Sequence, residues 1–234
     1  HRVSRRQRQM CIRDRTHCAL RTGNWDSGTV LEIEIGTSGK LYGSGGNGGN
    51  GGSANETAGT NGQTGSSALG IEYPCSINNL GIIQSGYGGG GGGGGNTRTT
   101  GGGKKSGATT NGSSGGGGGG GAGLPAGDAG GVQTPLAVGG GSAGSAGQAG
   151  SLSGQASGGA GGSEAGTGGN SSPVNNSASK ANDGGIYSSD GSQQSANGGI
   201  GGSNGYAIIT NQGSAPSLSG GGVTGRTITS TNPT

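Results

Sequence analysis

Only a few residues of this 234-residue chain could carry out acid–base, nucleophilic or metal chemistry. The histidines are His1 and His17, and the cysteines are Cys11, Cys18 and Cys75. A nucleophilic serine or cysteine needs a base beside it, and a zinc site of the usual type needs several His or Cys ligands. Both histidines fall in a terminal segment that we exclude from the fold, and Cys75 then stands alone. We therefore expect no enzyme, no metal site and no cofactor, and we expect Cys75 to pack inside a strand.

A pair of glutamates is the next candidate for chemistry. Glu32 and Glu34 alternate with Leu31, Ile33 and Ile35. A period of two puts the aliphatic side chains on one face of a strand and both acids on the other. Since the pair has no apolar wall to shift its protonation, we interpret it as a solvated strand face and not as a catalytic acid and base.

The basic N-terminal segment is unlike the rest of the chain. Seven of the thirteen Lys and Arg residues fall within residues 1–21. A basic arm ordinarily suggests nucleic-acid binding. However, Arg5 to Asp14, RRQRQMCIRD, looks like the in-frame translation of a transposase adapter from a sequencing library. We set residues 1–21 aside as an unstructured artefact, and we expect no nucleic-acid partner.

Glycine dominates the remainder. It accounts for 68 residues, whereas hydrophobic residues make up 24% and aromatic residues 3%. Such a chain has little apolar surface to bury, so it is either flexible or ordered through its backbone. In the ordered case, extended helices with three residues per turn would lie side by side, which requires glycine where they touch. The pure runs Gly88 to Gly95 and Gly115 to Gly121 are the places where this choice matters most.

Short β-strands are predicted before and after the glycine tract. A turn is expected at Gly36 to Gly39, another at Asn78-Asn79, and no window has a helical period. Aliphatic segments separated by Asn and Gly turns suit a stacked, coiled or sandwich arrangement of strands. Strands are predicted within residues 29–35, 40–42, 68–71, 75–77, 80–83, 206–210 and 227–229.

The order of these segments resembles a known family. GSGGNGGNGG, SINNLGIIQSGYGGGGGGGG and GGSNGYAIIT follow one another as they do in the glycine-rich receptor-binding tips of phage tail fibres, including the tail-tip adhesins of T-even-like phages. The resemblance covers about residues 24 to 230. It implies an all-β or irregular fold with essentially no α-helix: a β-rich entry region with a first glycine-rich excursion over 22–87, then a polyglycine type II helix sandwich with variable loops and closing strands over 88–234.

The function that the resemblance implies is adhesion. Loops on a rigid polyglycine scaffold would recognise a bacterial surface receptor, either an outer-membrane protein or a surface polysaccharide. The remaining partner would be the rest of the tail fibre, without insertion into a membrane. The protein would be made in the host cytoplasm and would reside in the virion.

Residues of the inserts between glycine segments are the candidate receptor contacts, because a rigid scaffold with exposed loops separates stability from recognition. Arg98 and Tyr187 rank first, since arginine and aromatic side chains supply most hot-spot energy. The full set is Thr97, Arg98, Lys104, Lys105, Leu124, Pro125, Gln133, Pro135, Leu136, Pro173, Asn175, Tyr187 and Asp190.

Two other functions are compatible with the composition. A structural or disordered matrix protein would be rich in glycine but would not need the strands before and after the tract. An ice-binding polyglycine protein would need a flat face of short side chains at three-residue spacing. The bulky and irregular insert at residues 132–138 argues against it.

Overall fold

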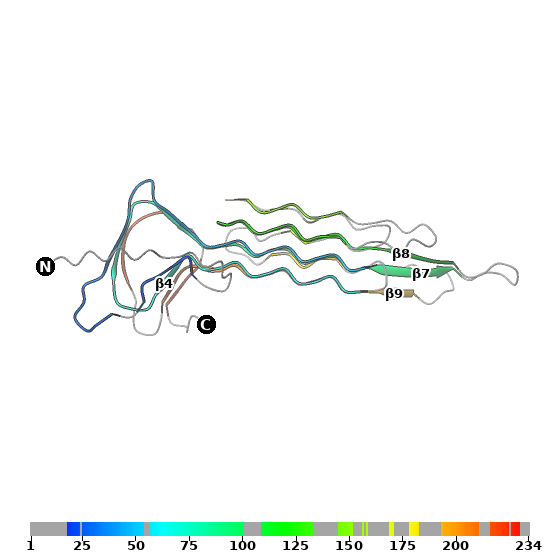
Figure 1. Cartoon of the computed structure of the whole chain (residues 1–234), viewed down its shortest axis with the longest axis horizontal. Coiled ribbons are helices and arrows are strands. Elements are labelled where there is room, and N and C mark those ends of the chain that lie inside the picture. The colour runs from blue at the N-terminus through cyan, green and yellow to red at the C-terminus, as the bar shows by residue number, and fades with distance from the viewer. Residues whose placement is uncertain are drawn as a thin grey trace, which may run out of the picture.

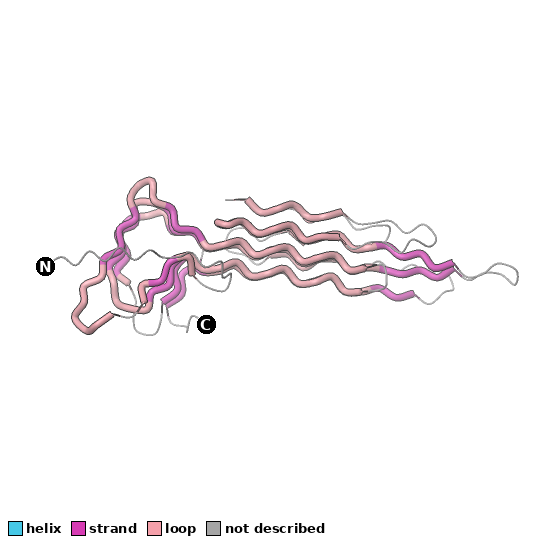
Figure 2. Tube along the Cα trace, viewed as in Figure 1, coloured by secondary structure: helices cyan, strands magenta, loops and turns pink. Residues whose placement is uncertain are grey.

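The computed structural model is an elongated molecule (Figure 1). A coil of β-strands forms one end, extended rods form the middle, and a small sheet lies at the far end (Figure 2). None of the described residues forms a helix, which confirms the expectation of a mainly β chain. The structure describes residues 18–23, 25–53, 57–100, 109–132, 145–151, 156, 158, 169–170, 178–182, 193–210, 216–224 and 226–229.

The coil has three sides, and each side is a parallel sheet. The strand orders are β1-β4-β10-β13, β2-β5-β11 and β3-β6-β12. Successive turns of the chain therefore stack on one another, so the coiled alternative among the predicted arrangements is the one that forms. The strands are β1 (Leu20–Arg21), β2 (Glu32–Ile35), β3 (Lys40–Tyr42), β4 (Leu69–Ile71), β5 (Ser76–Asn79), β6 (Ile82–Gln84), β10 (Tyr206–Thr210), β11 (Ser217–Gly220), β12 (Val223–Thr224) and β13 (Arg226–Thr229).

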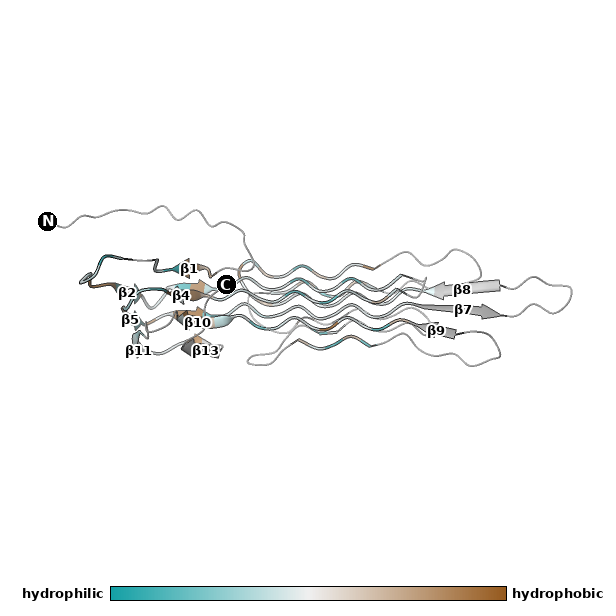
Figure 3. Ribbon diagram, turned by 90° about the horizontal axis from the view of Figure 1, so that it is seen from below, coloured by the Kyte–Doolittle hydropathy of each residue, from teal (hydrophilic) through white to brown (hydrophobic). Residues whose placement is uncertain are grey.

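The apolar core of the molecule lies inside this coil. Because the strands are in register, equivalent positions of successive turns stack, as Leu41, Ile83 and Val223 do on one side. Ile83 and Leu69 are both 0% exposed. Burying one such side chain contributes roughly 1.5–3 kcal/mol, so a few aliphatic residues suffice to fix this end. Figure 3 shows the brown of apolar residues gathered on the strands of the coil, with paler rods.

The glycine-rich rods are excursions from one corner of the coil. The first turn leaves after β3 and returns to β4, and the second leaves after β6 and returns to β10. At the same corner the third turn goes from β12 to β13 with a single residue between them. The rods are thus two insertions, residues 43–68 and 85–205, in an otherwise short β-coil.

A small antiparallel sheet lies at the far end of the rods. It comprises β7 (Asn96–Thr100), β8 (Thr109–Ser113) and β9 (Gln193–Ser195), in the order β8-β7-β9. Figure 1 places these strands at the end away from both termini. The sequence suggested only polar inserts here, because the residues are polar and lack an apolar alternation.

Most predicted strands are confirmed, with shifts at their ends. β2, β3, β10 and β13 fall within or beside the predicted ranges. Glu32 and Glu34 are both exposed, as expected of a solvated face. The turn at Gly36 to Gly39 is closed by the Gly39 N–H, which donates to the Gly36 carbonyl at 2.7 Å.

The turn predicted at Asn78-Asn79 is wrong. Both residues belong to β5, and the chain turns at Leu80-Gly81. Asn79 is 0% exposed and fastens the turn from inside the coil. Its Oδ1 accepts from the Gly81 N–H at 3.1 Å, and its Nδ2 donates to the Gly221 carbonyl at 2.5 Å.

An Asn79→Ala variant should lose about 2 kcal/mol of unfolding free energy, because it leaves the buried Gly81 N–H without its partner and removes the bond to the Gly221 carbonyl. Asn78→Ala is the matched control, since the neighbouring Asn78 is exposed, and it should change stability by less than about 0.5 kcal/mol. Urea unfolding monitored by circular dichroism measures both. Equal effects of the two variants would contradict the inward role of Asn79.

The expectation that residues 1–21 are unstructured is wrong at its C-terminal end. Leu20–Arg21 form β1, which pairs in parallel with β4. The Leu20 N–H donates to the Ala68 carbonyl at 3.0 Å, and the Leu20 side chain packs against the core. Residues 1–17, which include the adapter-like segment, lie outside the described residues.

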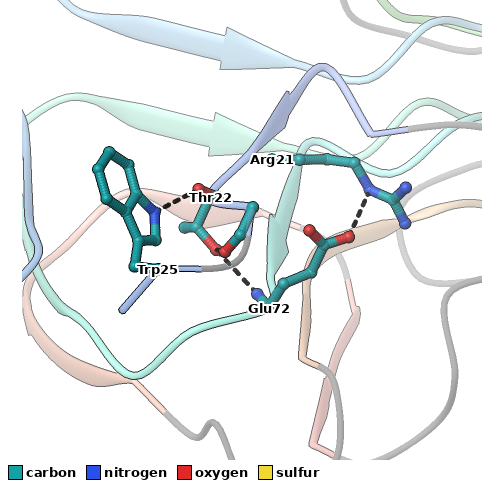
Figure 4. A network of polar contacts seen from close by, with 5 residues as sticks. Arg21, Thr22, Trp25 and Glu72 are labelled. Carbon is teal, nitrogen blue, oxygen red and sulfur yellow. Dashed lines mark hydrogen bonds and ion pairs between the residues drawn. The ribbon is translucent and has the colours of Figure 1, made fainter. Parts of the chain in front are cut away.

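A polar network fastens this N-terminal strand to the second turn of the coil (Figure 4). Arg21 Nε lies 3.2 Å from Glu72 Oε1, and the Glu72 N–H donates to Thr22 Oγ1 at 2.8 Å. Trp25 Nε1 donates to the Thr22 carbonyl at 2.7 Å. The fold therefore includes residues before the boundary that the sequence predicts at residue 22.

The boundary expected at residues 87/88 does not separate two units in space. Strands β10 to β13 stack on the coil, although they follow the glycine tract. Conversely, residues 43–53 and 57–68 of the first excursion pack among the later rods. Turns of the coil and excursions into the rods therefore alternate along the sequence.

Candidate binding surface at the far end of the rods

Backbone hydrogen bonds that recur every third residue join the rods. In the first rod, residues 43–53, the N–H groups of every third residue donate to the rod 85–95. The N–H groups of the residues just before them donate to the rod 125–131. All six bonds measure 2.8–3.0 Å. The pairs are Gly46 to Tyr87, Gly49 to Gly90, Gly52 to Gly93, Gly45 to Pro125, Gly48 to Asp128 and Gly51 to Gly131.

The polyglycine run lies at the centre of the bundle. Residues 85–95 are buried without exception, and their backbone groups bond to six surrounding segments. A Cβ at Gly90 would lie 1.9 Å from the Gly169 carbonyl oxygen, so no side chain fits there. The six segments are residues 43–53, 57–67, 114–122, 169–170, 178–182 and 196–205.

Rods at the edge of the bundle have fewer neighbours and therefore less glycine. In the first rod, Ser44, Asn47, Asn50 and Ser53 occupy every third position, and none of the four is buried. The third residue of each turn lies on the outer side of the rod, where a side chain has room. The three-residue repeat GGN thus encodes an edge rod, whereas an unbroken glycine run encodes the centre.

The direction of each rod decides which connections reach the far end. Rods 43–53 and 85–95 are parallel, because residue numbers rise together along their hydrogen-bonded pairs. Rods 57–67 and 85–95 are antiparallel. Rods therefore alternately leave and approach the coil. The rod 85–95 ends in β7, and β9 leads into the rod 196–205. The described residues on either side of 101–108 and of 183–192 therefore lie at or near the far end.

The predicted contact residues divide between the two ends. Thr97 and Arg98 lie in β7, the central strand of the far sheet, where Arg98 pairs with Asn111 of β8 and Gln193 of β9. Leu124 and Pro125 lie at the coil end, because the Leu124 N–H donates to the Gly43 carbonyl at 3.0 Å. Lys104, Lys105, Gln133, Pro135, Leu136, Pro173, Asn175, Tyr187 and Asp190 lie outside the described residues.

Sequence reasoning missed β8 and β9 as members of the far sheet. β9 reads Gln-Gln-Ser and β8 reads Thr-Thr-Asn-Gly-Ser, with no aliphatic residue in either. β9 is also separated from β7 by more than ninety residues of chain. Threonine, with its β-branched side chain, was the one local signal that favoured strands in β7 and β8.

The cysteines are placed as structural residues. Cys75 is 9% exposed within the core cluster of the coil, which confirms its predicted packing, although it lies just before β5 and not inside a strand. Burial raises the pKa of the Cys75 thiol, so its reactive thiolate is scarce at neutral pH. Burial also raises the pKa of Cys18, although the nearby Arg21 partly offsets this.

Within the part of the chain that the structure describes, no three His, Cys, Asp or Glu residues gather as metal ligands, and no helix is long and apolar enough to cross a membrane. A groove on the coil has Glu32, Glu34, Ser76, Asn78 and Ser217 among its lining residues. Its carboxylates belong to the solvated face of β2. The far sheet therefore remains the candidate binding surface.

No protein-family model, no curated protein and no solved structure matches this chain.

Proposed function

We propose that this protein is the receptor-binding tip of a phage tail fibre, an adhesion protein without catalytic activity. In this proposal the rods are polyglycine type II helices packed as a sandwich. The three-residue hydrogen-bond period supports that assignment, because this helix has three residues per turn. The absence of side-chain space at the centre supports it too, since threefold extended helices pack closely only through glycine.

The observation that carries the proposal is the separation of the two ends. The apolar core lies in the coil, and a polar sheet stands at the other end of a rigid bundle. Rod 85–95 alone would span about 30 Å at roughly 3.1 Å per residue. A surface held that far from the core can change its residues without disturbing the side-chain packing that stabilises the fold.

The proposal assigns a partner to each end of the molecule. The far sheet and the connections beside it would bind a bacterial outer-membrane protein or a surface polysaccharide. The coil end would face the rest of the tail fibre. In this proposal the protein would reside in the virion after synthesis in the host cytoplasm. The polar residues and central arginine of the far sheet suit hydrogen bonding to a hydrated surface.

The fold favours this adhesin over a disordered matrix protein, because a matrix chain has no use for a fully buried central rod. An ice-binding protein would present one flat face of short residues, whereas the exposed third positions of rod 196–205 include Ile200 between Asn197 and Ser203. A thermal-hysteresis assay separates an ice-binding protein from an adhesin. If micromolar protein depresses the freezing point, the ice-binding function would take the place of the adhesin proposal.

Substitution of Arg98 tests the binding surface. Fluorescently labelled protein should bind cells of at least one strain in a Gram-negative panel saturably, and Arg98→Ala should weaken that binding at least tenfold, as expected of a central hot-spot arginine. Glu34→Gln is the control, because it changes one charge on the exposed face of the coil. It should bind as the parent protein does.

Two results would contradict the proposal. One is the lack of saturable binding to every strain and to outer membranes prepared from them. The other is equal loss of binding in Arg98→Ala and Glu34→Gln, since binding would then not depend on the far sheet. Unfolding curves of both variants must match the parent, so that a loss of affinity is not a loss of fold.

A further inference from the structure

Three Asn-Gly steps make the same two-point contact with a neighbouring rod. Asn47 Oδ1 accepts from the Asp128 N–H at 2.8 Å, and the Gly48 N–H donates to the carbonyl of the same Asp128 at 2.9 Å. Asn50-Gly51 holds Gly131 in this way at 2.8 and 3.0 Å. Asn61-Gly62 holds Ile200 at 2.8 and 2.9 Å. We call this contact the Asn-Gly clamp.

The clamp occurs where a neighbouring residue has an N–H to offer. The same rod presents Ser44-Gly45 to Pro125, and Gly45 donates to the Pro125 carbonyl at 2.9 Å. Proline has no N–H, so an asparagine at position 44 would have nothing to accept. Each clamp asparagine therefore satisfies an edge amide that lacks a further rod to bond to.

Asn-Gly is also the dipeptide in which asparagine deamidates most readily, because glycine leaves the following nitrogen unhindered. In the step, the Gly48 nitrogen loses its proton and bonds to Asn47 Cγ, the Cγ–Nδ2 bond breaks, and ammonia leaves carrying that proton. Water then opens the cyclic imide to aspartate or isoaspartate. The nitrogen and Cγ must first reach a near-attack geometry, about 3 Å apart and correctly aligned.

We propose that the Asn-Gly clamps are deamidation sites that the packed rods keep closed, so that modification at residues 47, 50 and 61 reports opening of the bundle. In each clamp the attacking nitrogen is held by its N–H bond to the neighbouring carbonyl. The carboxamide is held by the N–H of the same neighbour. Both bonds must break before the nitrogen can turn onto Cγ.

The clamps close the sites although water reaches them. Asn50 and Asn61 are exposed, and Asn47 is half-buried. Exclusion of water therefore does not protect them, and the hydrogen bonds must. Deamidation at an open clamp would give aspartate, whose carboxylate can still accept from the same N–H, or isoaspartate. Isoaspartate puts an extra backbone atom into the three-residue repeat, and this product would keep the rods from closing again.

The test is peptide mapping by mass spectrometry after incubation at mildly alkaline pH, with the whole chain folded or in urea. Folded protein should deamidate at Asn47, Asn50 and Asn61 at least about tenfold more slowly than the unfolded chain, the factor expected for breaking two hydrogen bonds. Equal rates in the two states at these sites would overturn the proposal, whatever the receptor turns out to be.

One variant opens a single clamp. Asp128→Pro removes the N–H that donates to Asn47 Oδ1 but keeps the carbonyl that accepts from the Gly48 N–H. Proline suits an extended rod, and this rod already contains Pro125. Asn47 should then deamidate about fivefold faster, whereas Asn50 in the same molecule should be unchanged. Asp128→Ala removes the carboxylate and keeps the N–H, so Asn47 should remain slow.

Asn50 also reports whether the variant folds. If Asn50 and Asn61 accelerate with Asn47, Asp128→Pro has opened the bundle, and the comparison of folded and unfolded parent protein decides the proposal. An unchanged Asn47 in a folded Asp128→Pro protein would overturn it. So would acceleration at Asn47 in Asp128→Ala that equals the acceleration in Asp128→Pro.

Discussion

Replacing Gly92 by alanine should destabilise the bundle by about 4 kcal/mol or prevent the rods from assembling. The new Cβ would lie 1.9 Å from the Asn50 carbonyl oxygen and 2.3 Å from its carbon, which are backbone atoms that cannot rotate away. Gly92 cannot move aside either. Its N–H donates to the Thr60 carbonyl at 2.9 Å, and its own carbonyl accepts from Gly199 at 2.7 Å.

Gly131→Ala is the matched control for this substitution. A Cβ there would lie 3.4 Å from Asn50 Oδ1, which is ordinary contact with a side chain. An extended rod accepts alanine, so the variant should keep its stability or gain about 0.5 kcal/mol from the smaller entropy of the unfolded chain. Urea unfolding measures the difference, and hydrogen exchange at the amides of residues 88–95 locates it.

Hydrogen exchange is the measurement that could contradict the packing of the rods most directly. In the parent protein these amides should be strongly protected, because each of them that the structure places in a hydrogen bond faces a neighbouring rod and not water. Free exchange throughout residues 88–95 of the parent would show a loose chain. Unchanged protection in Gly92→Ala would show that the rods are farther apart than described.

The sequence carried more information on the rods than composition alone reveals. The repeat GSGGNGGNGGS has a strict period of three, and the unbroken run at residues 88–95 differs from it as a central rod differs from an edge rod. Glycine taken in blocks predicts connecting segments of irregular spacing, and it hides this period. A rod that neighbours enclose on every side has no room for a Cβ at any of its three positions per turn, whereas an edge rod has room at one of them.

The strands of the coil were predictable one by one, but their partners were not. The alternation at residues 31–35 defines β2 locally. No local signal indicates that β4 pairs with β10, more than 130 residues later in the chain, because a register across such a distance depends on the rods that return the chain to the corner. The far sheet was missed for the complementary reason: none of its residues is aliphatic, so no apolar alternation marks its strands.

Coil and rods depend on each other through the corner that joins them. The rods supply almost no apolar burial, and the coil has too few strands to close its third turn unless the rod 196–205 brings β10 back. Tyr87 is 3% exposed at the point where the second excursion leaves the coil, and this burial raises the pKa of its hydroxyl. Because the coil and the rods depend on each other, we expect the two parts to unfold in one cooperative step.

Ile83→Ala tests this coupling, because it should lower the unfolding free energy of the coil and of the rods together. Ile83 is 0% exposed and stacks between Leu41 and Val223, so its truncation should leave a cavity and cost about 3 kcal/mol of unfolding free energy. β6 carries the chain directly into the central rod. Loss of stability in the coil should therefore appear equally in the exchange of the amides at residues 88–95, which lie outside the coil.

Leu80→Ala is the control for this prediction, because Leu80 belongs to the same turn but is 52% exposed. It removes a side chain of the same size from a site that water already reaches, and it should cost less than about 1 kcal/mol. If Ile83→Ala lowers the stability of the coil and leaves the exchange of the central rod unchanged, the rods hold themselves together. The bundle would then be an independent unit, and the coil only its attachment.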